Sequence, residues 1–345
     1  MADPKEGLTM SNSKKSIVPV FFGCDDRFVP YMSVALQSMI DHTSSSRRYE
    51  VHILHNDISK ENQAKILPMA KRNVRIVFDN IDDEIHDIIH QLPIRDYYSA
   101  STYFRLVIAK AFPQFDKAIY IDCDTAVVDD VAKLFDICIG DKYIAAVPEA
   151  VMDAIDECGR YAEEVLGINR RKYFNAGMIV INSKKWREVD VLQQFIDLVH
   201  FYDFTIAQDQ DYLNVICKDK IYYLPRKWNM ECIHSWNVPP KERGIIHYAF
   251  AAKPWHDVTT VYANYFWEAA MKSPFFYDIK RDYAAYTLEQ LMAENNVAFT
   301  VASNCIKEIN RPDNFLKKCK QRAAAKDFAE GRLAPLLQSF AMLKA

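Results

Sequence analysis

Short apolar runs alternate with amphipathic segments along most of this chain, and this alternation limits the folds open to it. The strand-like runs are Ile17–Phe22, Tyr49–Leu54, Val74–Phe78, the run ending at Ile121, Tyr143–Val147, Met178–Ile181 and Ile221–Leu224. The helix-like segments include Tyr31–Asp41, Ser101–Ala111, Asp190–Phe201 and Asp209–Cys217. Such alternation favours a mainly parallel sheet covered by helices on both faces. We therefore predict an α/β fold for residues 16–276.

Two carboxylates close one of these apolar runs. The segment Lys117-Ala118-Ile119-Tyr120-Ile121-Asp122-Cys123-Asp124 reads as a buried strand that ends in an Asp-x-Asp pair. Side chains two residues apart on a strand point the same way, and open α/β sheets bind ligands beyond the carboxyl ends of their strands. Asp122 and Asp124 can therefore share one hard cation, which prefers oxygen ligands and commonly accompanies a diphosphate. The alternative is a polar turn that merely ends the strand.

Composition excludes several other classes of protein. The 345 residues are 50% hydrophobic and 26% charged, as in an ordinary globular protein. A formal net charge of −3 gives no general attraction to nucleic acid. The eight cysteines form no CxxC pair, so we expect a reducing, cytoplasmic location and no structural zinc site.

The sequence shows neither a membrane span nor a signal peptide. No run approaches the roughly 18 apolar residues of a membrane span, and the polar start lacks the apolar region of a signal peptide. Residues 1–15 are predicted to be disordered and to include sequence added for expression.

Three further polar clusters follow the aspartate pair. Phe174-Asn175-Ala176-Gly177 precedes an apolar strand, Gln208-Asp209-Gln210-Asp211 opens a helix, and His247-Tyr248 is followed by Lys253-Pro254-Trp255-His256. Each has a structural explanation: a turn, a helix cap and a structural histidine. Each cluster also has a functional explanation. In the third cluster, for example, imidazole suits transition metals such as manganese, and a lysine can carry phosphate charge.

In this order the clusters resemble the glycosyltransferase family 8 enzymes, most closely the bacterial lipopolysaccharide galactosyl- and glucosyltransferase branch. The resemblance runs from about Ile17 to His256 and includes Phe22-x-x-Asp25-Asp26 and Thr102-Tyr103-x-Arg105-Leu106. It implies a GT-A fold, a UDP-sugar donor and Mn²⁺ or Mg²⁺. It further implies transfer of galactose or glucose, with retained anomeric configuration, to a glycan such as lipopolysaccharide.

The resemblance also implies a role for individual residues. The metal ligands would be Asp122, Asp124 and His247. The contacts to the nucleotide would come from Gly23, Asp25, Phe28 and Cys123, and those to the donor hexose from Arg105, Asn175 and Asp209. Lys253 would share the charge of the leaving phosphate, and Gln210 would lie under the anomeric carbon. Glu149 matches an acidic acceptor-site position, with a plain surface glutamate as the alternative.

Two positions bear on how such an enzyme would work. Gln210 stands where a nucleophile is expected, and an amide is a poor nucleophile, so we favour front-face substitution by the acceptor hydroxyl. Double displacement through Asp209 or Gln210 remains open. Phe250 replaces a glycine found in relatives, and a phenylalanine does not adopt positive φ cheaply, which puts the geometry of this loop in doubt.

Residues 277–345 are predicted to form a helical C-terminal region. Thr287 and Gln290 have the spacing of a capping box. The segment 311–326 gathers basic residues around Phe315 and Leu316. Such a helix can lie on an anionic membrane surface, on the cytoplasmic face, and reach a lipid-linked acceptor. The alternative is an ordinary solvated helix.

Two other functions were weighed against a transferase. A noncatalytic UDP-sugar- or glycan-binding relative predicts the loss of a metal ligand or of Lys253, and all are present. A nucleotidyltransferase predicts a basic, glycine-rich triphosphate loop after the first strand, whereas Gly23-Cys24-Asp25-Asp26-Arg27 is acidic.

Overall fold

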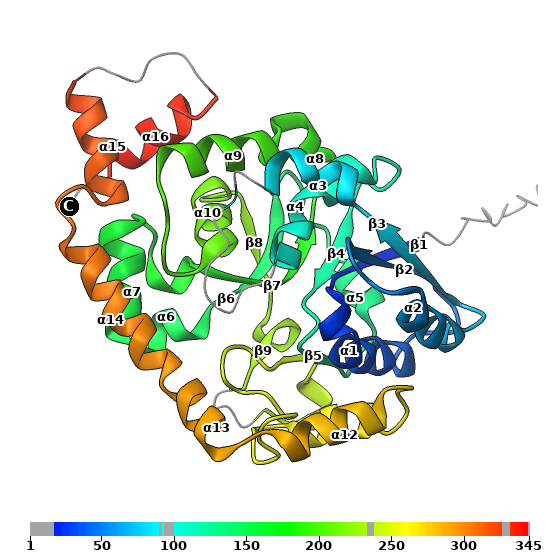
Figure 1. The fold of residues 1–345 in the computed structure, drawn as a ribbon. Coiled ribbons are helices and arrows are strands. Elements are labelled where there is room, and N and C mark those ends of the chain that lie inside the picture. Colours follow the sequence, from blue (N-terminus) through cyan, green and yellow to red (C-terminus); the bar gives the residue numbers. More distant parts are fainter. Residues whose placement is uncertain (1–16, 90–91, 93–99, 233–237, 326–331, 344–345) are drawn as a thin grey trace, which may run out of the picture.

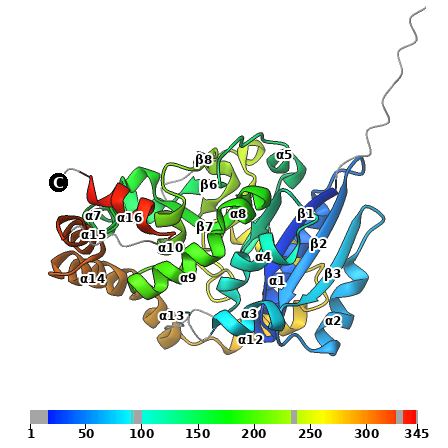
Figure 2. The same ribbon diagram turned by 90° about the horizontal axis from the view of Figure 1, so that it is seen from above.

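A seven-stranded sheet forms the centre of the molecule. The computed structural model describes residues 17–89, 92, 100–232, 238–325 and 332–343, so the prediction for residues 1–15 lies outside the described part. The strand order is β3-β2-β1-β4-β7-β6-β8 (Figures 1 and 2). The strands are β1 (Ile17–Gly23), β2 (Arg48–His55), β3 (Val74–Asn80), β4 (Ala118–Ile121), β6 (Ile144–Pro148), β7 (Phe174–Ile181) and β8 (Ile221–Tyr223).

The sheet is mostly parallel, as predicted. Only β7 runs antiparallel to its neighbours, β4 and β6, and the other four pairings are parallel. The α-helices are α1 (Val29–Asp41), α2 (Lys60–Ile66), α3 (Asp82–Ile89), α4 (Phe104–Ala111), α5 (Val131–Phe135), α6 (Ala150–Ala154), α7 (Asp156–Arg160), α8 (Ser183–Val189), α9 (Val191–Phe201), α10 (Gln208–Ile216), α11 (Ala263–Ala270), α12 (Phe276–Ala285), α13 (Leu288–Asn295), α14 (Val297–Asn310), α15 (Phe315–Ala324) and α16 (Ala334–Ala341). The predicted elements therefore exist, with ends that differ by a few residues.

Alternate side chains of the strands feed two separate hydrophobic cores, one on each face of the sheet. On β4, Ile119 and Ile121 join the core beneath α1 and α11, whereas Tyr120 joins the core beneath α4 and α9. Both faces are apolar because helices cover both. The prediction of a sheet covered on two sides is confirmed.

A small second sheet brings the third cluster of the sequence to the aspartate pair. It consists of β5 (Thr125–Val127), β10 (Ile245–His247) and β9 (Met230–Glu231), in the order β5-β10-β9. β10 is antiparallel to β5, with His247 opposite Thr125. Since β5 starts directly after Asp124, this pairing places His247 beside the aspartates.

Residues 174–177 do not form the turn that was the structural alternative for this cluster, because they begin β7. All four are buried, and Phe174 pairs with Pro148 across an irregularity in β6. The side chain of Asn214 receives a hydrogen bond from the Phe174 amide at 2.8 Å and donates one to its carbonyl at 2.9 Å. A side chain from α10 thus satisfies the backbone where the strand ladder is irregular.

The C-terminal helices wrap around one side of the catalytic fold, coloured orange to red in Figure 1. The capping box predicted at Thr287 and Gln290 is present at the start of α13. α14 packs against α7 and the π-helical turn Tyr161–Val165, and Cys305 and Phe315 are fully buried in the core under that face. The region is therefore integrated into the fold.

Several basic residues of segment 311–326 contact their own chain. Lys318 Nζ donates to the Phe201 carbonyl at 2.7 Å, and Lys317 Nζ donates to the Arg311 carbonyl at 2.7 Å. Arg311 forms ion pairs with Glu308 and Asp313, each at 3.2 Å. Part of the positive charge is thus used inside the protein. None of the helices in the described ranges combines the length and apolar character that a bilayer crossing requires.

Candidate active site

One pocket of about 530 Å³ opens where β1 and β4 end. All the residues assigned to the site from sequence line it, although they come from segments up to 230 positions apart. They are Gly23, Asp25, Phe28, Arg105, Asp122, Cys123, Asp124, Glu149, Asn175, Asp209, Gln210, His247 and Lys253. Val301 of α14 also lines the pocket, so the C-terminal region contributes to its wall.

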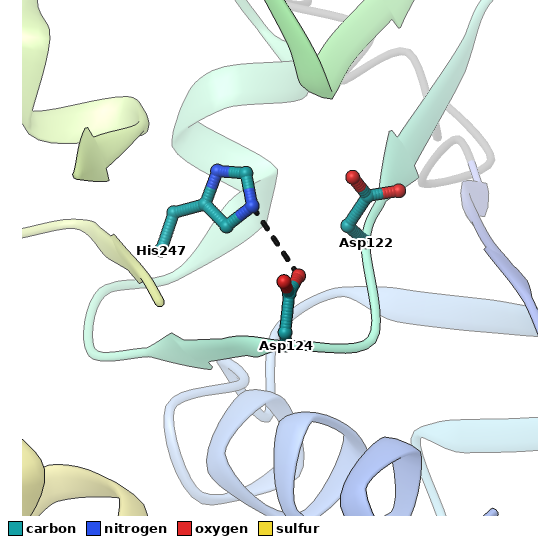
Figure 3. Close-up of side chains that lie close together, drawn as sticks. All are labelled: Asp122, Asp124 and His247. Carbon is teal, nitrogen blue, oxygen red and sulfur yellow. Dashed lines mark ion pairs between the residues drawn. The ribbon is translucent and has the colours of Figure 1, made fainter. Parts of the chain in front are cut away.

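Two aspartates and a histidine converge at one end of this pocket (Figure 3). One ligand atom from each of Asp122, Asp124 and His247 lies within 4.8 Å of the others. His247 Nε2 is 3.3 Å from Asp124 Oδ1, while its Nδ1 is 2.9 Å from Asn229 Oδ1. An Nδ1–H donated to Asn229 leaves Nε2 for a metal. Two carboxylates and an imidazole form a donor set that fits a divalent cation such as Mn²⁺.

Gly177 lies directly under this cluster. A Cβ atom at this position would be 2.7 Å from Asp122 Oδ2 and would overlap the His247 ring. The Gly177 carbonyl also accepts a hydrogen bond from the Asp122 amide at 2.7 Å. The strand can therefore support the cluster from below only if residue 177 has no side chain.

Positive charge surrounds Asp124. Lys253 Nζ donates to Asp124 Oδ2 at 2.6 Å and to the Tyr248 carbonyl at 2.6 Å. Burial alone would raise the pKa of Asp124, but Lys253 and His247 outweigh it and hold the pKa well below its ordinary value. Burial also opposes a charge on His247, and the attraction of Asp124 still raises the pKa of that imidazole. Asp124 is thus held in its ionised form, which is the form that could bind a cation.

Arg105 forms ion pairs with both Asp122 and Asp209. Its buried guanidinium stacks over the Tyr120 ring at 4.4 Å and lies 3.2 Å from Asp122 and 3.1 Å from Asp209. Burial raises the pKa of Asp209 to about 7, because Arg105 lowers it only in part and Asp122 adds repulsion. Asp209 Oδ2 is the oxygen that lies 3.1 Å from Arg105 Nε, but it accepts no well-aligned hydrogen bond from a described residue. A buried carboxylate oxygen of this kind can accept a ligand hydroxyl.

Gln210 is held in one orientation at the centre of the pocket. Its Oε1 accepts a hydrogen bond from the Ala176 amide at 2.8 Å, and its Nε2 donates to Glu149 at 3.3 Å and to the Tyr173 hydroxyl at 3.4 Å. Gln208, at the start of α10, has a φ of 39°. Strained backbone of this kind clusters at functional sites, where the surrounding structure fixes it.

Asn175 uses its whole amide to hold neighbouring groups. Its Oδ1 accepts from the Gly177 amide and from Asn229, both at 2.8 Å, and its Nδ2 donates to Glu149 at 2.7 Å and to Glu231 at 3.0 Å. An amide can make four such bonds, so none is left for a sugar in this arrangement. Asn175 thus connects Glu149 and Glu231 to Asn229, the residue that contacts His247.

Glu149 is not a surface glutamate, because only 2% of its area is exposed. It accepts from Asn175 and Gln210 and caps α6 through the Val151 amide at 3.3 Å. Glu231 shares Asn175 with it, and burial together with the charge of Glu149 raises the pKa of Glu231 well above its ordinary value.

Two aromatic side chains that line the pocket, Phe28 and Tyr31, pack with the buried Trp255. Phe28 lies 5.1 Å from Tyr31 and 5.9 Å from Trp255, and these last two rings stack at 4.3 Å. Cys123 Sγ donates to the Gly23 carbonyl at 3.2 Å, which joins the β1 and β4 ends. The aromatic rings thus offer a flat apolar face next to backbone polar groups.

Comparison with known proteins agrees with this geometry. The sequence model of glycosyl transferase family 8 matches residues 19–259. The chain belongs to glycosyl transferase family 8. This family 8 enzyme is 30% identical over 246 residues to a putative glycosyltransferase of Haemophilus influenzae, covering 69% of this chain and 72% of the relative. It is 26% identical over 274 residues to the lipopolysaccharide 1,3-galactosyltransferase of Salmonella typhimurium, covering 74% and 78%.

Solved structures of related enzymes share the fold. The galactosyltransferase LgtC, in complex with donor and acceptor sugar analogs, matches this glycosyltransferase with a TM-score of 0.62 and 28% identity over 74% of this chain and 96% of LgtC. The bifunctional glycosyltransferase WbbM matches with a TM-score of 0.69 and 26% identity over 79% of this chain. This chain spans 53% of WbbM. The GT-A fold is thereby confirmed, and the nucleotidyltransferase alternative is set aside.

Two residues of the glycosyltransferase site were missed from sequence. Asn229 orients His247, and Glu231 shares the Asn175 amide with Glu149. The segment Trp228-Asn229-Met230-Glu231 nevertheless forms no motif. Their only signal is spatial: β9 pairs with β10 and places Glu231 level with His247. No pattern within the sequence could have identified them.

Phe250 resolves the doubt about the loop after His247. Its φ is 54°, so the phenylalanine adopts the backbone region that glycine would favour. Its side chain remains 40% exposed. The loop therefore adopts a left-handed backbone at Phe250 at the cost of strain.

Proposed function

We propose that this glycosyltransferase moves a galactose or glucose unit from UDP to a hydroxyl of a glycan acceptor, retains the anomeric configuration, and depends on Mn²⁺ or Mg²⁺. The observation that carries the proposal is the meeting of Asp122, Asp124 and His247 within 4.8 Å, in a pocket of about 530 Å³. Carboxylates and imidazole at the end of a parallel strand suit a cation that holds a diphosphate.

The pocket has room for a donor lying between its two ends. The uracil is assigned to Phe28, Asp25 and the Gly23 backbone, where the aromatic rings offer a stacking face. The hexose is assigned to the region of Asp209 and Arg105, which form a buried ion pair at 3.1 Å. A sugar hydroxyl donated to Asp209 Oδ2 would add a hydrogen bond to that ion pair, since this oxygen accepts no well-aligned one from the described residues.

Lys253 and the metal ligands are assigned to the departing UDP. A bound Mn²⁺ would supply Lewis-acid stabilisation of the negative charge on the leaving phosphate. Lys253, 2.6 Å from Asp124, is close enough to the metal ligands to share that charge.

Front-face substitution is the mechanism that the pocket supports best. Gln210 is the residue assigned to the position under the anomeric carbon, and an amide stabilises positive charge through its oxygen better than it attacks carbon. The acceptor hydroxyl would attack from the side on which UDP leaves and give its proton to a phosphate oxygen. Double displacement through Asp209 or Gln210 is the second candidate, because Asp209 is a carboxylate in the same pocket.

The acceptor is proposed to be a lipopolysaccharide, a lipooligosaccharide or another cell-surface glycan, bound near Glu149 and carried on a lipid. The similar protein of Salmonella typhimurium is named a lipopolysaccharide 1,3-galactosyltransferase, and a further relative, from Escherichia coli, is named a lipopolysaccharide 1,2-glucosyltransferase. We further propose peripheral contact of segment 311–326 with the cytoplasmic membrane face, and a division into a catalytic domain at residues 16–276 and an associating region at residues 277–345. Liposome sedimentation of Lys320→Glu with Arg322→Glu tests this contact: undiminished binding to anionic vesicles would reject it.

A donor panel tests the function itself. The protein is incubated with Mn²⁺ and each of UDP-galactose, UDP-glucose and their N-acetylated forms, and UDP release is measured. We expect one of the unmodified hexoses to be used at least 10-fold faster than the rest. The anomeric proton of the product, followed by NMR, is expected to show the donor's α configuration, and an initial β product would contradict retention.

A further inference from the structure

A second hollow of about 290 Å³ adjoins the donor pocket. The two share Val151, Ala249 and Phe250 as lining residues. The other walls of the second hollow are Glu231, Cys232, Ala251, Ala252, Asp257, Thr259, Thr260, Val261 and Leu291. It therefore continues from the acceptor side of the pocket toward α13, and a ligand that extends beyond Glu149 would enter it.

Phe250 stands at the junction of the two hollows. Its backbone has a φ of 54°, and its ring is 40% exposed. Non-glycine backbone in this region is strained, and a ring that stays exposed regains little of that cost by burial. Core packing therefore does not explain where this ring lies. A strained, exposed aromatic ring between two cavities can pack against the apolar face of a sugar ring.

The chemistry of the walls limits what the second hollow can hold. Its described lining residues include the acidic side chains of Glu231 and Asp257 and no lysine, arginine or histidine. The described wall therefore offers no positive charge to hold a phosphate or another anion. Thr259 and Thr260 supply hydroxyl groups, and Asp257 Oδ1 accepts from the Thr259 amide at 2.8 Å and from its hydroxyl at 2.7 Å, which fixes this loop. Hydroxyls and carboxylates beside an aromatic ring suit a neutral polyhydroxyl ligand.

We propose that the second hollow is a subsite for the sugar residue next to the one that receives the hexose, with Phe250 as its packing surface. This inference rests on the proposed glycosyltransferase function and adds to it an acceptor class. The enzyme selects acceptors of at least two sugar units over single sugars, because only the longer acceptor fills both hollows.

The test compares single-sugar and two-sugar acceptors. Methyl β-galactoside and methyl β-glucoside are assayed against methyl β-lactoside, methyl β-cellobioside and methyl β-maltoside, with the preferred UDP-hexose and Mn²⁺. The expected result is a KM at least 10-fold lower for one of the disaccharides than for either monosaccharide, in line with the discrimination that one well-filled pocket provides.

Two variants connect that preference to the second hollow. Leu291→Trp narrows it from α13, and Thr260→Val removes a hydroxyl from its wall. Both are expected to raise the KM of the preferred disaccharide to within about 2-fold of the monosaccharide value. Ile306→Trp, at an exposed position of α14, is the bulk-matched control and keeps the preference.

Release of UDP to water without any acceptor separates the possible failures. Acceptor-free release that is unchanged in Leu291→Trp and Thr260→Val shows that fold and donor site are intact. Its absence with every UDP-sugar in the unaltered protein would contradict the proposed function. If release is present, equal KM values for one and two sugars, failure of every glycoside as acceptor, or a disaccharide preference untouched by both variants would overturn the subsite.

Discussion

Asn229 Oδ1 lies 2.9 Å from Nδ1 of His247, on the side of the imidazole that faces away from Asp124. This bond fixes the ring and leaves Nε2 directed at the two aspartates. Removing a residue that hydrogen-bonds a metal-binding histidine typically lowers metal affinity by 10- to 100-fold. We therefore expect Asn229→Ala to weaken Mn²⁺ binding by that factor, as measured by electron paramagnetic resonance of free Mn²⁺. Asn264→Ala, at an exposed position of α11, serves as the control. Equal affinity in both variants would show that Asn229 has no orienting role.

Gly177→Ala is predicted to disrupt the same cluster from below. The added methyl group would lie 2.7 Å from Asp122 Oδ2 and would overlap His247, so one of these ligands must move. Mn²⁺ affinity should fall by at least 10-fold. Gly140→Ala is the control, because Gly140, unlike Gly177, lies away from the site. A Cβ atom at Gly140 would meet open space, although its φ is 55°. It should lower the melting temperature slightly and leave Mn²⁺ affinity unchanged. Tight Mn²⁺ binding by Gly177→Ala would contradict the packing argument.

The substitution Gln210→Ala tests the step at the anomeric carbon. It removes the amide oxygen that is held by the Ala176 amide at 2.8 Å. Losing one electrostatic group at a reacting centre typically costs 10²–10³ in turnover, so kcat should fall by about that factor while the KM of the UDP-sugar changes less than 3-fold. Intact mass spectrometry of the enzyme during turnover should find no glycosyl adduct. A trapped adduct on Gln210 or Asp209 would replace front-face substitution by double displacement.

Asp211 should give the protein a recognisable pH dependence of stability. It is buried beneath the hydroxyls of Tyr161 and Tyr173, at 2.9 and 2.7 Å, and burial raises its pKa to about 6. The folded state then holds a proton that the unfolded state, with an ordinary aspartate pKa near 3.8, has released. The contribution of Asp211 to stability is present below pH 4 and lost as the pH rises through 6.

The comparison with Asp211→Asn isolates this effect from other titrating groups. The difference in free energy of unfolding, unaltered protein minus variant, should decrease by about 2 kcal/mol between pH 4 and pH 7, at 1.36 kcal/mol per unit of pKa shift. Urea denaturation at several pH values measures it. A difference that stays constant or increases with pH would mean that Asp211 is ionised in the folded state throughout this range.

The parts of the site that sequence could predict are those with local chemical patterns. Asp122 and Asp124 stand together at the end of an apolar run, so strand geometry alone indicates a shared ligand. His247 needed the family resemblance, because the pairing of β10 with β5 is a long-range contact. The choice between a turn and a ligand-binding segment at residues 174–177 could not be made from sequence, because Asn214 of α10 satisfies the Phe174 backbone and extends the strand, which no local propensity includes. Asn229 and Glu231 could not be predicted, because their partners, His247 and Asn175, are brought to them only by folding.

The C-terminal helices give a similar lesson about charge. Arg311, Lys317 and Lys318 read as a basic, membrane-facing segment, yet each bonds to its own chain. A sequence shows the sign of a charge. It does not show whether that charged group is already bonded to a carbonyl of α9 or to a neighbouring carboxylate. Helical periodicity predicted the elements, while tertiary contacts decided which of their faces are free.

The most direct test of the central claim is UDP release as a function of Mn²⁺ concentration, in the unaltered protein and in Asp124→Ala. Asp141→Ala, at an exposed position, is the matched control. We predict saturable, Mn²⁺-dependent release by the unaltered protein and by Asp141→Ala, abolished by chelation, and a loss of at least 10³-fold in Asp124→Ala. Equal release by Asp124→Ala, or release that is indifferent to chelation, would contradict a metal-dependent transferase built on Asp122, Asp124 and His247.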